Sequence, residues 1–377
     1  MPRFLSEARN IYVVLGAPKR PGGWNVNGTI YDFSGLPQTV AFATEVHGRG
    51  HVRRAGRAGR AAVEPGRIGL VSNPRSHRNR TAALAGGSPR ADGLAAAPRT
   101  RAALRDVLAR FAAARVDLLV IDGGDGTVRD VLTCAGDLWG ARWPRIAVLP
   151  SGKTNALAAD LGVPRGWTLD DAIEAARVGR VATRAPVAVE RRGGSGGVVR
   201  GFLFGAGAFV AATALAQRTH RAGAFNGVAV ALALGGAIAQ TLFGAVDGEW
   251  RRGGPMRLRY DPRSVAMHDA PLAADHDQYL LFASTLERLP LGIRPFGTVR
   301  PGLKTLSIDA PPRRLTAMLP ALLTGSESVR LDRAGYRRVD TPTLDVDLTG
   351  EFILDGEVFP AGSYRINESV PLRFVVP

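Results

Sequence analysis

The feature that most constrains the fold is a short apolar strand that leads directly into a glycine-rich loop. Residues 117–121 read Asp-Leu-Leu-Val-Ile, and residues 122–127 read Asp-Gly-Gly-Asp-Gly-Thr. A compact apolar run bounded by turn residues is typical of a strand that is buried on both faces. The residues that follow, 127–138, predict a helix. A strand, a glycine loop and a helix in this order indicate a parallel sheet covered by helices.

The neighbouring segments repeat this alternation. Residues 68–72 and 146–149 are further apolar runs that predict strands, and residues 99–115 carry Leu, Val and Phe at helical spacing. Strands that alternate with helices are typical of a parallel sheet. We therefore expect an α/β domain over residues 67–180.

From about residue 181 the pattern changes to short alternating segments separated by Gly and Pro, which predicts a mostly antiparallel β domain over residues 181–377. The expected strands are residues 187–189, 202–204, 256–260, 279–283, 344–348, 352–354 and 372–376, and helices are expected near 208–219, 225–243 and 313–323. The expected fold class is thus α/β, with an N-terminal parallel-sheet domain and a C-terminal, mostly antiparallel β domain.

Two segments stand apart from this plan. Residues 1–66 lack a core pattern, and their Gly- and Arg-rich part at 47–60 cannot bury enough apolar surface to fold. We expect a disordered extension there, or alternatively a tether to an anionic surface. Residues 227–246 are apolar over roughly the length of a membrane span, but Gln240 interrupts them. A buried or amphipathic helix is expected at that place, and no transmembrane span.

The composition narrows the partners and the compartment. With 49 Lys and Arg against 33 Asp and Glu, the net charge is +16, which favours anionic partners such as a phospholipid surface. Aromatic residues do not alternate with the Arg clusters, so nucleic acid is not an expected partner. The single cysteine, Cys134, and the lack of a secretory signal after Met1 fit a cytoplasmic protein. The six histidines show no metal-ligand spacing, so no protein-held metal site is expected.

The glycine loop has the chemistry of a phosphate site. Gly123, Gly124 and Gly126 let the backbone approach a ligand closely, and the N–H groups at the helix start favour an anion. Thr127 can add a hydroxyl donor. Asp125 beside a phosphate is reasonable if Mg²⁺ or a donor hydroxyl lies between them. A strand–helix turn without any ligand is the alternative interpretation.

The sequence Gly-Gly-Asp-Gly-Thr after an apolar strand resembles the signature that diacylglycerol kinases, sphingosine kinases and NAD kinases share. Three further segments resemble the diacylglycerol kinase branch: Asn-Pro-Arg-Ser at 73–76, Pro-Ser-Gly-Lys-Thr-Asn at the start of 150–162, and Asp-Gly-Glu at 355–357. The four motifs occur in the order of that family, and the resemblance spans about residues 67–377. It implies a lipid kinase that uses ATP and Mg²⁺.

The resemblance also implies the site residues. For nucleotide binding these are Asn73, Pro74, Ser76, Gly123, Gly124, Asp125, Gly126, Thr127, Gly152, Lys153, Thr154 and Asn155. Lys153 stands where the family has Thr, and its ammonium could contact the triphosphate. Glu357 takes the role of the base that accepts the proton of the lipid hydroxyl, and Asp125 belongs to the catalytic set. From the residues alone, Asp355-Gly356 between apolar runs also predicts a hairpin turn.

The sequence departs from the family at two places. Phe209 stands where the family often has Asp, and Pro301-Gly302 stands where bacterial members have an Asp-Gly loop associated with an accessory metal. Both changes remove carboxylates.

The expected function is an ATP-dependent lipid kinase that acts on a diacylglycerol-like or sphingoid lipid in phospholipid biosynthesis. We expect it in the cytoplasm, peripheral to the membrane that holds its substrate. A catalytically silent nucleotide- or lipid-binding protein on the same fold is the alternative. An NAD kinase fits less well, because the Asn-Glu of that family is found here only at 367–368, near the C-terminus.

Overall fold

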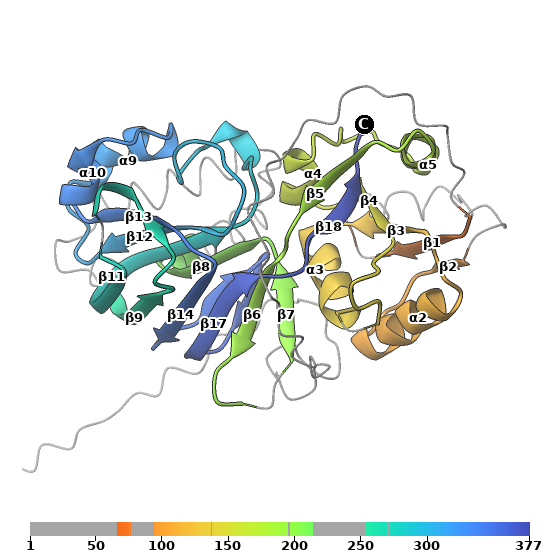
Figure 1. Cartoon of the computed structure of the whole chain (residues 1–377), viewed down its shortest axis with the longest axis horizontal. Helices are drawn as coiled ribbons and strands as arrows, with labels where there is room; N and C mark the ends of the chain where they lie inside the picture. The colour runs from red at the N-terminus through yellow and green to blue at the C-terminus, as the bar shows by residue number, and fades with distance from the viewer. Residues whose placement is uncertain are drawn as a thin grey trace, which may run out of the picture.

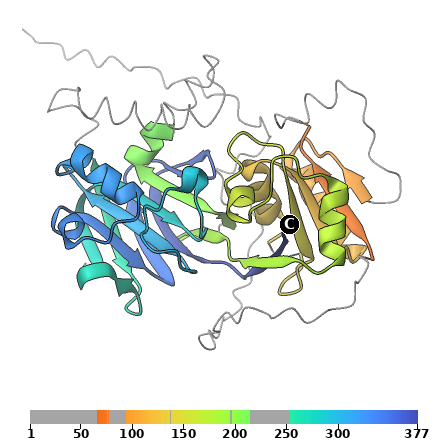
Figure 2. The same cartoon turned by 90° about the horizontal axis from the view of Figure 1, so that it is seen from above.

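The chain forms two β-sheets that lie side by side, as the two views in Figure 1 and Figure 2 show. The computed structural model describes residues 66–74, 76, 94–136, 138–194, 197–213, 253–269 and 271–377. Within these residues one sheet has six strands and the other has twelve. The fold class is the expected one: a mainly parallel sheet with helices comes first, and a mainly antiparallel sheet follows.

The six-stranded sheet has the order β2-β1-β3-β4-β18-β5. Its strands are β1 (Ile68–Ser72), β2 (Leu94–Ala96), β3 (Leu118–Gly123), β4 (Arg145–Pro150), β5 (Val181–Arg184) and β18 (Leu372–Val375). Pairings β1–β2, β1–β3 and β3–β4 are all parallel. The helices that accompany these strands are α2 (Arg101–Ala113), α3 (Asp125–Cys134), α4 (Ala156–Asp160) and α5 (Leu169–Arg177).

Local sequence explains why these elements form. In β3 the residues from Leu118 to Ile121 are all fully buried, as the apolar run predicts. The helix α2 begins after Thr100, whose hydroxyl accepts a hydrogen bond from the Ala103 N–H. The helix α5 begins with a capping box between Thr168 and Asp171. The strands expected at 68–72 and 146–149 and the helices expected at 99–115 and 127–138 are therefore confirmed within a few residues.

The twelve-stranded sheet has the main order β10-β13-β12-β11-β9-β14-β17-β6-β7, with β8, β15 and β16 attached beside it. Its strands are β6 (Val187–Arg191), β7 (Val198–Gly201), β8 (Leu203–Gly207), β9 (Gly254–Tyr260), β10 (Val265–Ala266), β11 (Ala273–Ser284), β12 (Lys304–Asp309), β13 (Tyr336–Asp340), β14 (Thr343–Leu348), β15 (Phe352–Leu354), β16 (Glu357–Phe359) and β17 (Gly362–Glu368). The helices α9 (Leu315–Leu323) and α10 (Val329–Arg333) belong to this half.

One strand lies in the other sheet from the one expected. The segment 372–376 was predicted for the antiparallel β domain, but β18 pairs in parallel with β4 and antiparallel with β5. Its apolar residues Leu372, Phe374 and Val375 are buried in the core that covers α3 and β4. An apolar strand can be buried in either sheet, so its sequence does not determine which strands it pairs with. The domain division at 180/181 remains a prediction.

Several expected elements lie partly or wholly outside the described residues. The helix expected near 208–219 begins at residue 208 and is described as far as residue 213. The helix expected at 225–243, the apolar segment 227–246 and residues 1–65 all fall outside. Among the helices that are described, none is long and apolar enough to cross a membrane. The helix expected at 313–323 is α9.

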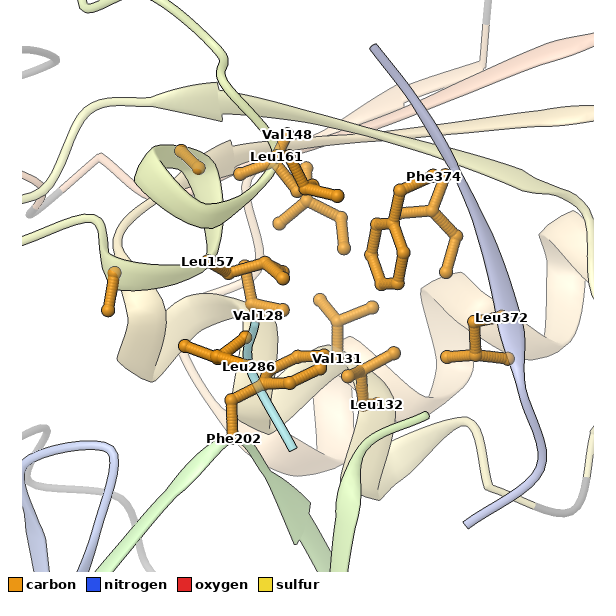
Figure 3. Packing of buried hydrophobic residues seen from close by; sticks show 14 of the residues in the cluster. Val128, Val131, Leu132, Val148, Leu157, Leu161, Phe202, Leu286, Leu372 and Phe374 are labelled. Atoms are coloured by element: carbon orange, nitrogen blue, oxygen red, sulfur yellow. The ribbon is translucent and has the colours of Figure 1, made fainter. Parts of the chain in front are cut away.

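The two halves share a hydrophobic core around α3. Figure 3 shows Phe202 and Leu286, from the second half of the chain, beside Val128 and Val131 of α3. Phe202 was expected inside a strand, but it lies at the bend between β7 and β8. Because both halves pack on α3, the loop at the start of this helix is held at a fixed place between them.

Candidate functional site

Three loops meet at the edge of the first sheet where β1, β3 and β4 end. The carboxyl ends of parallel strands lie at the same edge, which is where ligands bind in open α/β sheets. Asp122 joins the three loops: its Oδ2 accepts a hydrogen bond from the Ser72 hydroxyl at 2.9 Å, and its Oδ1 accepts one from the Ser151 hydroxyl. Sequence reasoning did not identify this role, since Asp122 was seen only as the first residue of the glycine loop.

The first loop is bonded to the glycine loop. The Asn73 side-chain amide donates to the Thr127 hydroxyl at 2.9 Å, and the Asn73 N–H donates to the carbonyl of Asp122, also at 2.9 Å. Both side chains are buried. Pro74 follows, partly exposed, and the Ser76 N–H donates back to the Asn73 carbonyl at 3.0 Å. The Ser76 hydroxyl is buried without a hydrogen-bond partner within the described ranges.

The glycine loop and the loop after β4 touch backbone to backbone. A Cβ added to Gly124 would lie 2.9 Å from the Gly152 Cα, and one added to Gly152 would lie 2.5 Å from the Gly124 Cα. A Cβ on Gly123 would lie 2.5 Å from the Thr127 Cβ. At Gly126 the nearest atom would be an Arg129 nitrogen at 3.7 Å, an ordinary contact distance. Packing within the chain therefore requires glycine at 123, 124 and 152, whereas at 126 it does not.

Asn155 shapes the loop after β4. Its side-chain oxygen accepts from the Gly152 N–H at 2.9 Å, and its amide donates to the Gly152 carbonyl at 2.8 Å. Its backbone has the left-handed conformation, with φ of 54°. Lys153 and Thr154 are exposed at the tip of the loop that this side chain closes.

Asp125 begins α3 and contacts the start of α4. Its Oδ1 accepts a hydrogen bond from the Leu157 N–H at 3.2 Å. The residue as a whole is partly exposed, but desolvation of the carboxyl raises its pKa. Asp125 therefore holds two of the three loops together, the glycine loop and the loop after β4.

The Asp-Gly-Glu segment forms the predicted hairpin turn between β15 and β16. Asp355 and Gly356 have φ of 46° and 80°, the left-handed pair that a two-residue turn requires. The Asp355 carboxyl turns inward and accepts hydrogen bonds from the N–H groups of Phe202 and Leu203 at 2.9–3.1 Å. Burial, together with the negative charge of Asp125, raises the pKa of Asp355 to about 7. The turn residue is thus also an anchor in the protein interior.

A buried arginine connects this hairpin to α3. Arg129 lies one helical turn after Asp125, and its side chain is only 4% exposed. It donates to the carbonyls of Leu354 and Asp355 at 3.2 and 3.3 Å and to Glu357 Oε2 at 3.4 Å. The Glu357 side chain keeps 24% exposure. Sequence reasoning missed Arg129, although an Arg-Asp pair inside an apolar helix is itself an unusual signal.

Comparison with known proteins agrees with the motifs. Residues 70–188 match the sequence profile described as the diacylglycerol kinase catalytic domain. This segment is therefore similar to the catalytic domain of diacylglycerol kinases, over less than half of the chain. The profile covers the first three motifs, and the Asp-Gly-Glu hairpin lies beyond it. The family is one of nucleotide-using kinases.

The fold also agrees with solved structures of this kind. A crystal structure of a diacylglycerol kinase from Bacillus anthracis strain Sterne has 16% sequence identity and a TM-score of 0.55. The match covers 84% of this chain and 98% of that one. A second structure from the same organism, described as a candidate diacylglycerol kinase, has 15% identity, a TM-score of 0.56 and the same coverage. At such identity the likeness shows the fold alone. A comparison with curated protein sequences finds no significant match.

At the first departure from the diacylglycerol kinase pattern, an aromatic stack replaces the expected carboxylate. The Phe209 ring stacks on Phe282 with centroids 5.1 Å apart, and Phe282 stacks on Phe296 at the same distance. A Cβ on Gly205 would lie 2.1 Å from the Phe209 ring, so the ring can occupy this position only because residue 205 has no side chain. The surface beside β8 is therefore apolar where family members often carry a charge.

At the second departure, a lysine supplies the cation. Lys304 is 2% exposed, and its ammonium donates to the carbonyls of Arg300 and Gly302 at 3.0 and 2.8 Å. The carbonyls on either side of Pro301 thus accept hydrogen bonds from an ammonium of the chain itself. These two carbonyls already accept from Lys304, and no carboxylate stands at 301–302, so this loop lacks the Asp that accompanies the accessory metal in bacterial family members.

Across the described part of the chain, no three His, Cys, Asp or Glu side chains gather in a way that could hold a metal ion. Cys134 is buried, as expected, and burial raises the pKa of its thiol to about 12. A thiol with so high a pKa is not a nucleophile at neutral pH.

Proposed function

We propose that the chain is an ATP-dependent lipid kinase that transfers the γ-phosphate to a hydroxyl of a diacylglycerol-like or sphingoid lipid. The observation that carries the proposal is the contact between Arg129 and Glu357. Arg129 belongs to the helix that the glycine loop opens, and Glu357, assigned as the base, belongs to β16, so this contact connects the glycine loop's helix to the base. The phosphoryl donor and acceptor sites of a kinase must be placed together in this way.

The chemistry of the loops at 73–76, 123–127 and 152–155 suits a nucleoside triphosphate. The Ser76 hydroxyl, buried without a partner among described residues, is a polar group that a ligand would satisfy. Gly126, whose Cβ would meet no close neighbour, leaves room above the helix start for a phosphate. Lys153 and Thr154 are exposed at the loop tip and could reach it. Asn73, Gly123, Gly124 and Asn155 would act by holding these loops in shape.

A Mg²⁺ ion that arrives with the nucleotide also fits. Such an ion is usually held by substrate phosphates and one or two carboxylates, with water in the other positions, so a cage of protein ligands is not required. Of the two acidic residues in the glycine loop, Asp125 would be the one to contribute an oxygen, because both oxygens of Asp122 accept hydrogen bonds from serine hydroxyls. The metal would supply charge neutralisation at the transferred phosphoryl group.

The chemistry of the chain itself centres on Glu357. A lipid hydroxyl is a poor nucleophile at neutral pH, and a positioned base typically accelerates such a step by roughly 10²–10⁴-fold. Among described residues Glu357 is bonded to Arg129 through Oε2, so we assign Oε1 to the lipid hydroxyl. The neighbouring Asp355 is bonded to backbone N–H groups and shapes the turn. The apolar wall around Phe209 and the net charge of +16 suit a lipid at an anionic membrane surface.

The experiment that tests this function measures transfer of labelled γ-phosphate from ATP. Purified protein is offered Mg²⁺ and mixed micelles that contain diacylglycerol or sphingosine, and a parallel reaction contains NAD. We expect a labelled lipid and no labelled NAD. Glu357→Gln keeps the shape of the side chain, so it should fold and bind ATP normally while lipid phosphorylation falls at least a hundredfold. Glu351→Gln, an exposed change just before β15, is the matched control and should keep parental activity.

The outcomes separate the candidate functions. ATP binding without phosphate transfer to any lipid would favour a catalytically silent binding protein. The observation that favours this alternative is the absence of carboxylates at Phe209 and Pro301-Gly302. Labelled NAD would favour the NAD kinase. If Glu357→Gln phosphorylates lipid at the parental rate, the base has been assigned to the wrong residue.

A further inference from the structure

Arg129 uses every nitrogen of its guanidinium to join two helices to the hairpin. Nε and Nη2 donate to Asp130 Oδ1 at 3.3 and 3.0 Å, and Nη1 donates to the carbonyls of Leu354 and Asp355. Nη2 also reaches Glu357 Oε2. Asp130 in turn accepts from Arg101 of α2 at 3.3 Å. A continuous polar path therefore runs from α2 through α3 to the hairpin.

The middle of this path is buried, and its end at the hairpin is partly exposed. The side chains of Asp130 and Arg129 are 3% and 4% exposed, whereas that of Glu357 is 24% exposed. Nearby carboxylates raise the pKa of Arg129 against the effect of its burial, so the guanidinium stays charged at any working pH. A buried charge is retained only when it is paired and fully hydrogen-bonded, as this one is. Of the two carboxylates that Arg129 contacts, Glu357, the one assigned as the base, is the more exposed.

We propose that Arg129 is the positioning residue of the kinase reaction: it fixes the Glu357 carboxylate and the turn that carries it relative to the phosphate loop. The inference rests on the proposed function. The two carbonyl bonds hold the turn, and the bond to Oε2 sets the direction of the carboxylate, so that Oε1 faces the acceptor. Arg129 itself neither takes nor delivers a proton.

Lysine cannot replace this arginine. A guanidinium has five N–H donors in a planar fork, whereas an ammonium has three donors at one point. A lysine at 129 keeps the charge but cannot reach Asp130, the two turn carbonyls and Glu357 together. Because a displacement of about 1 Å at a reacting group can lower a rate by about a hundredfold, we expect Arg129→Lys to lower kcat by roughly ten- to a hundredfold. The KM for ATP should change less than twofold.

A double-mutant cycle isolates the positioning role. If Arg129 acts through Glu357, then Arg129→Lys should have no further effect on kcat in the Glu357→Gln background. Arg101→Lys is the matched control, because Arg101 bonds the same Asp130 but does not contact the hairpin. It should leave kcat within about twofold of the parent. Equal and additive losses in both backgrounds would overturn the proposal, since Arg129 would then act independently of the base.

Hydrogen exchange provides a second readout that needs no activity. In the full chain, the amides of residues 354–358 should exchange faster in Arg129→Lys and in Arg129→Ala than in the parent. Their exchange rates should be unchanged in Arg101→Lys. Unchanged exchange in both Arg129 variants would overturn the proposal even if kcat falls. Should the parent phosphorylate no lipid, the proposed function fails, while the exchange rates still decide whether Arg129 holds the hairpin.

Discussion

Replacing Gly152 with alanine tests whether the close approach of the two nucleotide loops matters. The added Cβ would lie 2.5 Å from the Gly124 Cα and 2.8 Å from the Asn155 side-chain oxygen. Carbon atoms in contact normally stay about 3.5–4.0 Å apart, so the loops must separate by about 1 Å. Both neighbours are held: one is backbone and the other is bonded twice to Gly152 itself. The substitution therefore cannot be absorbed by the rotation of a free side chain.

The magnitude follows from this overlap. Overpacking of this kind typically destabilises a protein by about 1–3 kcal/mol, so we expect the melting temperature to fall by a few degrees. If both loops cradle the nucleotide, ATP should bind about tenfold to a hundredfold more weakly, which corresponds to about 1.4–2.8 kcal/mol. Isothermal titration with ATP and Mg²⁺ measures the second effect, and thermal unfolding measures the first.

Gly166→Ala is the control for this substitution. A Cβ at Gly166 meets no atom within 4 Å, so neither the affinity nor the melting temperature should fall. If Gly152→Ala binds ATP as tightly as the parent while Gly166→Ala does too, the two loops do not form a common nucleotide site. A loss of stability without a loss of affinity would lead to the same conclusion.

Two further predictions concern charged groups of the site. Lys153→Ala should weaken ATP binding by about 1–3 kcal/mol, the range of a charge-assisted hydrogen bond, and it should weaken ADP binding by less. If Lys153→Ala binds ATP as tightly as the parent in titration calorimetry, Lys153 is a solvated surface residue. For Asp355, the folded-state pKa of about 7 lies above the ordinary 3.8, so between these pH values the folded protein holds a proton that the unfolded chain has lost. This group therefore makes the free energy of unfolding decrease as pH rises from about 4 to 7, by at most about 4 kcal/mol. Asp355→Asn should remove that slope in urea unfolding measured at pH 5 and 7.5, and an unchanged slope would contradict the assigned cause.

The sequence predicted those parts of the fold that depend on neighbouring residues. The strand at 118–123, the helix after it and the turn at Asp355-Gly356 follow from apolar periodicity and from residues that tolerate positive φ. The glycine loops were found for the same reason. Each of these loops is defined by a short motif of adjacent residues.

The remaining features depend on residues far apart in the chain, which no local pattern reveals. Arg129 contacts Glu357 across more than two hundred residues, and the Lys304 ammonium is buried at the start of a strand that reads as partly polar. Asp122 bridges two serines, one at the end of β1 and the other just after β4. Charged and hydroxyl side chains are mostly exposed in proteins, so sequence alone gives no reason to expect these buried pairs. What the site residues bind stays a prediction.

The position of β18 has a consequence for the order in which the chain can assemble. Residues 372–375 fill the place between β4 and β5, in a sheet whose first strand begins at residue 68. Nascent chains usually fold their N-terminal parts first. Here the sheet that carries the three loops of the candidate site stays open between β4 and β5 until the strands of the other sheet have been translated. The half that would bind ATP is therefore closed by a strand made only after the half that would bind the acceptor.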